Sequence, residues 1–297
     1  MTFTSQTFET NGQSIHAKVL GPDDAPVMIM LHGFPEYWFA WAEIAPAFSK
    51  DYRIILPDQR GFNLSSKPEG VENYDMKHLV ADLHGIVEQV SPGAPFMLCG
   101  HDWGASVAYA YAMRHGDRVK KLVIANGVHP ICFQKALLAG GAQTDASQYI
   151  RTLRDKTNEP ALAANDFARV VAMFEKFSSA PWLDKHELEG YLTAWRHPGA
   201  FTNMINWYRA SPLEVPLSGT PGKDLEITDD MRSKYRITMP HLLLWGTRDQ
   251  ALLESCYADL DQFCDDLTIH KNDDGSHWLL HEVQDWVIDE IKTFLAN

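Results

Sequence analysis

Two hydrophobic patterns alternate along the chain: short continuous apolar runs, and longer segments whose apolar residues recur at helical spacing. Continuous apolar runs are typical of strands buried on both faces, and their alternation with helices predicts a mostly parallel sheet covered on both sides. The runs that we interpret as strands are Ile15–Leu20, Val27–Leu31, Arg53–Leu56, Phe96–Cys99, Lys121–Ala125, His241–Trp245 and Leu267–His270.

Three helices of this pattern have recognisable ends. Asp75 is placed to cap a helix that stops at Ser91-Pro92-Gly93. A second helix covers Ala105–His115, and the last one covers approximately Leu280–Leu295, where apolar residues again fall on one face. Acidic caps at the start and Gly or Pro at the end are the usual boundaries of helices. The helices therefore separate the predicted strands, as an α/β fold requires.

The strand pattern disappears between about His129 and Arg236, where the sequence predicts helices broken by prolines. Asp184 with Glu187 three residues later forms a capping-box pattern at the start of one of them. We interpret residues 129–236 as a helical insertion, and residues 1–128 and 237–297 as the α/β core. The aromatic residues of the insertion need a surface on which to be buried. The carboxyl edge of the sheet, where α/β folds bind ligands, provides one.

The net charge and the absence of cofactor motifs favour a protein that acts on a small molecule. The formal net charge is −13, which disfavours nucleic acid and anionic membrane surfaces as partners. The amino terminus has no basic or apolar leader, so we expect a cytoplasmic protein. No metal, nucleotide or flavin motif is present, and we expect no cofactor and no metal site. The sequence is compatible with a homodimer.

The most informative motif is Gly100-His101-Asp102-Trp103-Gly104, which joins a predicted strand to a predicted helix. Glycines two residues before and after a central residue permit a sharp strand-to-helix turn, called a nucleophile elbow, that exposes the central side chain above the sheet. The helix amino terminus also favours an anionic group at this point. Asp102 is therefore our candidate nucleophile.

Three other turns place polar groups after predicted strands. The turn at His32-Gly33-Phe34-Pro35 could aim the N–H of Phe34 at the elbow, where it would form an oxyanion hole with the N–H of Trp103. Asp249 and His277 each follow a strand near the end of the chain. The chain order Asp102, Asp249, His277 is that of a nucleophile, acid and base in hydrolases with an elbow.

The chain resembles the epoxide hydrolase and haloalkane dehalogenase branch of the α/β-hydrolase superfamily over nearly its whole length. The matching stretches are His32–Glu36, Asp58–Gly61, Gly100–Gly104, Trp245–Asp249 and Gly275–Trp278. The resemblance implies an α/β-hydrolase fold, with a mostly parallel eight-stranded sheet, helices on both faces and the insertion as a cap. The chain departs from the family pattern at Phe62-Asn63-Leu64, where the family commonly has Tyr and Gly.

The resemblance favours an epoxide hydrolase that acts through an ester on Asp102. A carboxylate attacks saturated carbon to form an ester, which a water activated by His277 and supported by Asp249 would hydrolyse. Two cap tyrosines would protonate the epoxide oxygen. Asn206-Trp207-Tyr208-Arg209 resembles the segment that supplies one of them, and Tyr149 is our candidate for the other, with Tyr191 as the fallback.

The expected substrate is a small, largely apolar molecule that bears an epoxide. The substrate-binding residues that we expect are Trp38, Trp103, Phe133 and Trp207. A substrate with a carboxylate beside the reacting carbon is disfavoured, because Trp103 and Val107 stand where arginines would be needed. For Glu36 we weigh two roles, placing the hydrolytic water or capping a helix near Pro35, and we favour the cap.

Two other functions stay open. A haloalkane dehalogenase would use the same three residues, with Trp103 as one halide donor and a cap tryptophan, Trp195 or Trp207, as the second, because Phe34 provides no side-chain donor. A non-catalytic binding module of the same fold is the third reading, since fold alone does not establish activity. The presence of all three candidate catalytic residues argues against it.

Overall fold

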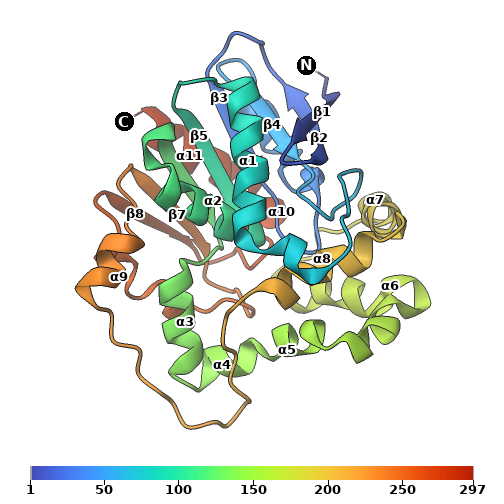
Figure 1. Ribbon diagram of the computed structural model, residues 1–297, viewed down its shortest axis with the longest axis vertical. Helices are drawn as coiled ribbons and strands as arrows, with labels where there is room; N and C mark the ends of the chain where they lie inside the picture. The colour runs from blue at the N-terminus through green and yellow to red at the C-terminus, as the bar shows by residue number, and fades with distance from the viewer. Residues whose placement is uncertain (1, 297) are drawn as a thin grey trace.

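A computed structural model describes residues 2–296 of the chain. Its centre is an eight-stranded sheet with the order β1-β2-β4-β3-β5-β6-β7-β8 (Figure 1). β1 and β2, and β2 and β4, pair antiparallel, and the other neighbours pair parallel. The strands are β1 (Thr4–Thr10), β2 (Gln13–Leu20), β3 (Val27–Leu31), β4 (Arg53–Pro57), β5 (Phe96–His101), β6 (Val119–Ala125), β7 (His241–Gly246) and β8 (Leu267–Asn272).

The seven strands that the sequence predicts are all present, and the mostly parallel eight-stranded sheet is confirmed. The strand that the hydrophobic pattern missed is β1, whose sequence has Phe8 as its one large apolar residue. It lies at the edge of the sheet, pairs with β2 alone and exposes most of its side chains. A strand that is largely exposed has no apolar run to reveal it.

Helices cover both faces of the sheet and produce two hydrophobic cores (Figure 1). Along β5, Phe96 and Leu98 belong to the core that includes α1 (Met76–Val90) and α2 (Trp103–Arg114). The intervening Met97 and Cys99 belong to the core on the other face, which includes α10 (Leu279–Glu282) and α11 (Gln284–Ala296). Side chains of a strand alternate between faces, so one apolar run serves both cores.

Two helix ends differ in detail from the prediction. The last predicted helix is divided at Val283 into α10 and α11. Asp75 stands at the N-cap of α1, but its side chain accepts no capping hydrogen bond and instead lies 3.3 Å from Nζ of Lys77. The capping box at Asp184 is confirmed, since Asp184 Oδ1 accepts the N–H of Glu187 at 2.8 Å and Glu187 Oε2 accepts the N–H of Asp184 at 2.9 Å.

Between β6 and β7 the described chain contains helices and loops and no strand. The helices α4 to α8 lie together at one end of the sheet (Figure 1). In the described residues no helix is both long and apolar enough to span a membrane. The helices of this segment are α3 (Pro130–Leu138), α4 (Ala142–Ala146), α5 (Gln148–Arg154), α6 (Glu159–Lys176), α7 (Lys185–Arg196), α8 (Ala200–Ala210) and α9 (Asp229–Lys234).

Candidate active site

Asp102 occupies a sharp turn between β5 and α2. Its backbone has φ 51° and ψ −119°, a conformation that L residues rarely adopt. Both flanking glycines are needed for it: a Cβ on Gly104 would lie 2.3 Å from the carbonyl oxygen of Leu31, and one on Gly100 would lie 2.6 Å from that of Gly104. The elbow that the glycine spacing predicts is therefore present, and it holds the carboxylate of Asp102 at the carboxyl end of the sheet.

The turn after β3 comes close to this carboxylate. The backbone N–H of Phe34 donates a hydrogen bond to Asp102 Oδ1 at 2.7 Å. The preceding Gly33 makes the approach possible, because a Cβ there would lie 2.4 Å from Cβ of Asp102. Phe34 thus occupies the place of the expected oxyanion donor. The N–H of Trp103, at the start of α2, stays a prediction as the second donor.

Asp249 and His277 converge on Asp102 from the ends of β7 and β8. Nδ1 of His277 lies 2.8 Å from Asp249 Oδ2, and its Nε2 lies 3.6 Å from Asp102 Oδ2. Asp249 Oδ1 also accepts the N–H groups of Ala251 at 2.7 Å and Leu252 at 2.9 Å. These hydrogen bonds hold the Asp249 carboxylate in place and fix the side of the imidazole that faces Asp102.

The two carboxylates determine the charge of His277. Burial alone would lower its pKa, but the negative charges of Asp249 and Asp102 outweigh that effect and raise the pKa to about 10. With both carboxylates ionised, His277 is therefore a cation at neutral pH, and it stands next to the nucleophile.

Asn126 contacts this site, and the sequence analysis did not predict it. It follows β6, its Nδ2 donates to Asp249 Oδ2 at 2.6 Å, and its Oδ1 accepts the N–H of Gly246 at 2.7 Å. The side chain thus fastens both Asp249 and the turn that carries it. The signal was available, because Asn126 is a polar residue directly after a buried strand, as Asp102 is.

A small cavity of about 40 Å³ lies beside Asp102 between the elbow and the helices α5 and α8. Both predicted tyrosines line it, with the ring centroids of Tyr149 and Tyr208 6.2 Å apart. Burial, together with the charge of Asp102, raises the pKa of both phenols well above the usual value. The lining consists of Asp102, Trp103, Ser106, Val128, Phe133, Tyr149, Ile150, Arg154, Tyr208, Ser211, Leu213 and Leu252.

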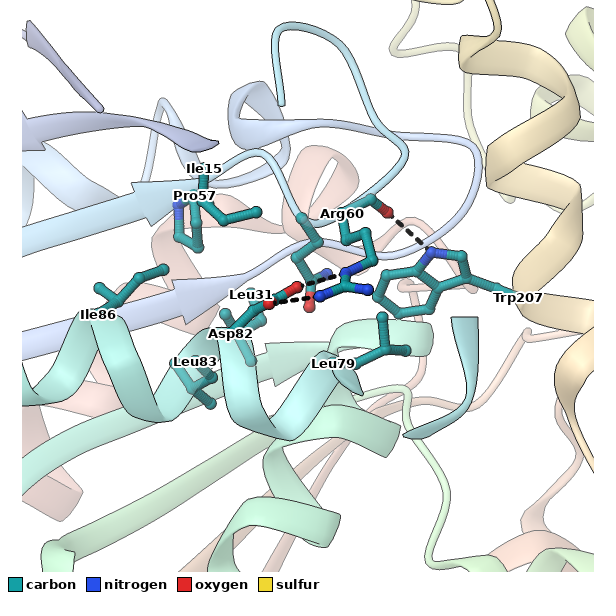
Figure 2. A pocket seen from close by; sticks show the side chains of 10 residues that line it. Ile15, Leu31, Pro57, Arg60, Leu79, Asp82, Leu83, Ile86 and Trp207 are labelled. Atoms are coloured by element: carbon teal, nitrogen blue, oxygen red, sulfur yellow. Dashed lines mark hydrogen bonds and ion pairs between the residues drawn. The ribbon is translucent and has the colours of Figure 1, made fainter. Parts of the chain in front are cut away.

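Of the four expected substrate-binding residues, Trp103 and Phe133 line this cavity, and Trp207 does not. The indole of Trp207 lies behind that of Trp103 and donates to the carbonyl oxygen of Arg60 at 2.9 Å. Figure 2 shows this contact beside a buried ion pair, in which Nε of Arg60 lies 2.7 Å from Oδ2 of Asp82. On α8, Trp207 faces the core and anchors the helix that carries Tyr208, so it lies outside the lining of this cavity.

Trp38 lies in a different part of the molecule. Its ring lies 5.4 Å from that of Phe3 and 5.3 Å from Nζ of Lys18, next to the antiparallel edge of the sheet. It packs on the hydrophobic core of α11, and it is not among the residues that line the Asp102 cavity. The segment after the Phe34 turn changes direction, which the apolar pattern does not reveal.

Glu36 neither caps a helix nor lines the cavity. The short helix after it begins at Trp38, and no side chain caps it. Instead the buried carboxylate accepts the hydroxyl of Tyr191 at 2.9 Å and lies 2.7 Å from Nε2 of His281. Burial raises the pKa of Glu36, but His281 and His101 outweigh burial and hold it well below its usual range. The hydroxyl of Tyr191 is thus bound to Glu36, whereas Tyr149 lines the cavity together with Tyr208.

Comparisons with known proteins agree with this architecture. Residues 26–283 match the family described as alpha/beta hydrolase fold. The chain is 31% identical to the AB hydrolase superfamily protein YfhM of Bacillus subtilis, over 98% of each. It is also 31% identical to epoxide hydrolase 2 of Caenorhabditis elegans, over 93% of this chain and 80% of that protein. A solved structure, described among novel epoxide hydrolases from metagenomes of hot environments, superposes with a TM-score of 0.87 at 33% identity, over 99% of each chain.

The chain belongs to the α/β-hydrolase fold family. Within that family it belongs to the branch of the epoxide hydrolases, and the resemblance found in the sequence is confirmed.

Proposed function

We propose that the protein opens an epoxide to a vicinal diol through an ester on Asp102. The observation that carries this proposal is the position of Tyr149 and Tyr208, whose rings line the same cavity as Asp102. An epoxide leaves as an alkoxide, which is a far stronger base than a phenolate, so a phenol can protonate it as the carbon–oxygen bond breaks. The raised pKa values of both tyrosines keep them protonated and ready to donate.

In the first step, one oxygen of the Asp102 carboxylate attacks an epoxide carbon, and the ring oxygen takes a proton from a tyrosine. Oδ1 is already held by Phe34 at 2.7 Å, which leaves Oδ2 as the attacking atom. The product is a hydroxyalkyl ester of Asp102 and one tyrosinate. Because the ester is neutral, one of the two charges that hold a proton on His277 is lost.

The second step follows from that loss of charge. The pKa of His277 falls once Asp102 is esterified, so the imidazolium can return a proton to the tyrosinate and become a base. It then takes a proton from a water that attacks Cγ of Asp102. Oδ1 becomes the oxyanion, facing the N–H of Phe34. Collapse of this intermediate breaks the bond between Cγ and the substrate oxygen, and that oxygen takes the proton of the new Cγ hydroxyl as it leaves. Release of the diol restores the Asp102 carboxylate, the imidazolium and both phenols, so protons balance over the cycle.

The geometry gives less support to a haloalkane dehalogenase. Such an enzyme needs N–H donors for the departing halide, and the two cap indoles that could join Trp103 are both engaged. Trp195 donates to the carbonyl oxygen of Pro35 at 2.6 Å, and Trp207 donates to that of Arg60 at 2.9 Å. A non-catalytic binding module gains no support either, since the three candidate catalytic side chains converge.

A paired assay on styrene oxide and 1-bromobutane tests the proposal. Purified protein is followed for diol and for bromide, with Asp102→Ala as the blank. Diol without bromide, absent in the Asp102→Ala variant, supports an epoxide hydrolase. Bromide without diol would assign the site to dehalogenation and overturn the role given to the tyrosines.

A further inference from the structure

Arg154, the last residue of α5, brings a positive charge to the wall of the Asp102 cavity. Its guanidinium is half-buried and contacts three main-chain carbonyl oxygens that follow or end α8. Nε donates to Tyr208 at 2.8 Å, Nη1 to Leu213 at 2.7 Å and Nη2 to Ser211 at 3.1 Å. These contacts fix the plane of the guanidinium beside the cavity.

Within residues 2–296, no carboxylate forms an ion pair with Arg154. Two other arginines lie near it: Arg209, whose Nε donates to the carbonyl oxygen of Arg154, and Arg151, one turn earlier on α5. Arg209 is paired with Glu159 at 2.7 Å, whereas Arg151 donates to the carbonyl oxygen of Val215 at 2.8 Å. Two further arginines thus lie near Arg154, although Asp155 follows it directly in the chain and the whole chain has a net charge of −13.

A guanidinium has five N–H donors in a planar fork that matches a carboxylate. Three of the nitrogens each spend one donor on a carbonyl oxygen, so Nη1 and Nη2 each retain one N–H. Burial and the nearby Arg151 lower the pKa of Arg154, and both effects would be relieved by an anion. The protein itself does not supply that anion, but a substrate could.

We propose that Arg154 is an anion subsite at the far end of the cavity and binds the carboxylate of an ω-epoxy carboxylic acid. The proposal rests on the proposed function, because the epoxide must lie between Asp102 and the tyrosines. Tyr149 and Arg154 are five residues apart on α5, a rise of roughly 7 Å along the helix axis. As the probe we choose ω-epoxyoctanoate, in which six carbon–carbon bonds separate the epoxide from the carboxylate.

This subsite differs from the one that the sequence analysis disfavoured. A carboxylate beside the reacting carbon would need cations at the elbow, where the chain has Trp103 and Val107. Arg154 lies on a cap helix, so it would select an anionic group remote from the epoxide. The apolar part of the cavity lining, including Phe133, Ile150 and Leu213, suits a methylene chain.

The test compares ω-epoxyoctanoate with its methyl ester, which has the same epoxide and chain but no charge. For the wild type we expect kcat/KM to be higher for the acid by roughly 10- to 100-fold, the range of a charge-assisted hydrogen bond. Arg154→Gln should abolish the preference, and Arg154→Lys should keep part of it. Arg151→Gln is the matched control, since it removes the same charge from the same helix outside the cavity lining, and it should leave the preference in place.

Arg154 could instead serve only to fasten the end of α8. In that case Arg154→Gln would slow both substrates equally and leave their ratio unchanged, which would overturn the subsite. A wild-type enzyme that prefers the methyl ester, or shows no preference, would overturn it without any variant.

Octanoate binding, measured by calorimetry, separates this proposal from the proposed function. Diol from the methyl ester without Arg154-dependent octanoate binding would refute the subsite alone. Binding of octanoate that is lost in Arg154→Gln and kept in Arg151→Gln, in a protein that forms no diol, would refute the epoxide chemistry and keep the anion site.

Discussion

Replacement of Asp102 by asparagine tests whether the nucleophile's charge controls the protonation of His277. The asparagine keeps the shape of the side chain and, like the ester intermediate, carries no charge. Nε2 of His277 lies 3.6 Å from Asp102 Oδ2. At an effective dielectric constant of about 20, a unit charge pair at that distance interacts with roughly 4 to 5 kcal/mol, or about 3 pKa units. Both side chains are almost completely buried, so solvent screening is weak.

We expect the pKa of His277 to fall from about 10 in the wild type to roughly 7 in Asp102→Asn. Imidazole nitrogen resonances, followed by NMR against pH, measure both values, and His277→Gln assigns the signal. Ser106→Ala is the control, because it changes a neutral residue of the same cavity and should leave the pKa near that of the wild type. Intact-mass measurement verifies that the amide has not been hydrolysed to aspartate.

A His277 pKa that stays within about half a unit of the wild type would refute the reasoning. It would mean that Asp249 alone holds the proton, so that esterification of Asp102 cannot release it. His277 would then be unable to act as the base in the second step, and another group would have to activate the water.

Three further substitutions separate the steps. His277→Gln should let the ester form but not hydrolyse, so intact-mass spectrometry should show the protein heavier by one substrate, and no adduct would contradict the covalent route. Tyr208→Phe should slow ester formation by about tenfold or more while folding stays intact, measured by rapid-quench kinetics. Asn126→Ala removes a hydrogen bond to a charged Asp249, so ester hydrolysis should slow by roughly 10- to 100-fold; an unchanged single-turnover rate would deny Asn126 a positioning role.

The sequence predicted the residues at strand ends best. Asp102, Asp249 and His277 each follow a strand of a parallel sheet, and the carboxyl ends of such strands lie at one edge. Once the strands are assigned, topology alone brings these side chains near one another. Asn126 fits the same rule, but an amide is not a member of the nucleophile, acid and base set that the pattern predicts.

Residues on the cap and in the turn after β3 could not be placed in this way. Whether Trp207 or Tyr208 faces the substrate depends on the rotation of α8, which is set by a contact with Arg60 that is 147 residues distant in the chain. Trp38 and Glu36 depend likewise on how one turn bends. Long-range packing determines these side-chain orientations, so the local pattern of apolar residues cannot predict them.

The choice between Tyr149 and Tyr191 shows how the buried polar groups decide what the pattern leaves open. Both are aromatic residues on cap helices, and a tyrosine can donate its hydroxyl to whichever acceptor lies near. Tyr191 donates to Glu36, a buried carboxylate that needs donors to remain charged. If Tyr191 turned toward Asp102, the buried carboxylate of Glu36 would lose one of its hydrogen-bond donors. The hydrogen-bonding demand of Glu36 therefore holds Tyr191 away from Asp102 and leaves Tyr149 as the partner of Tyr208.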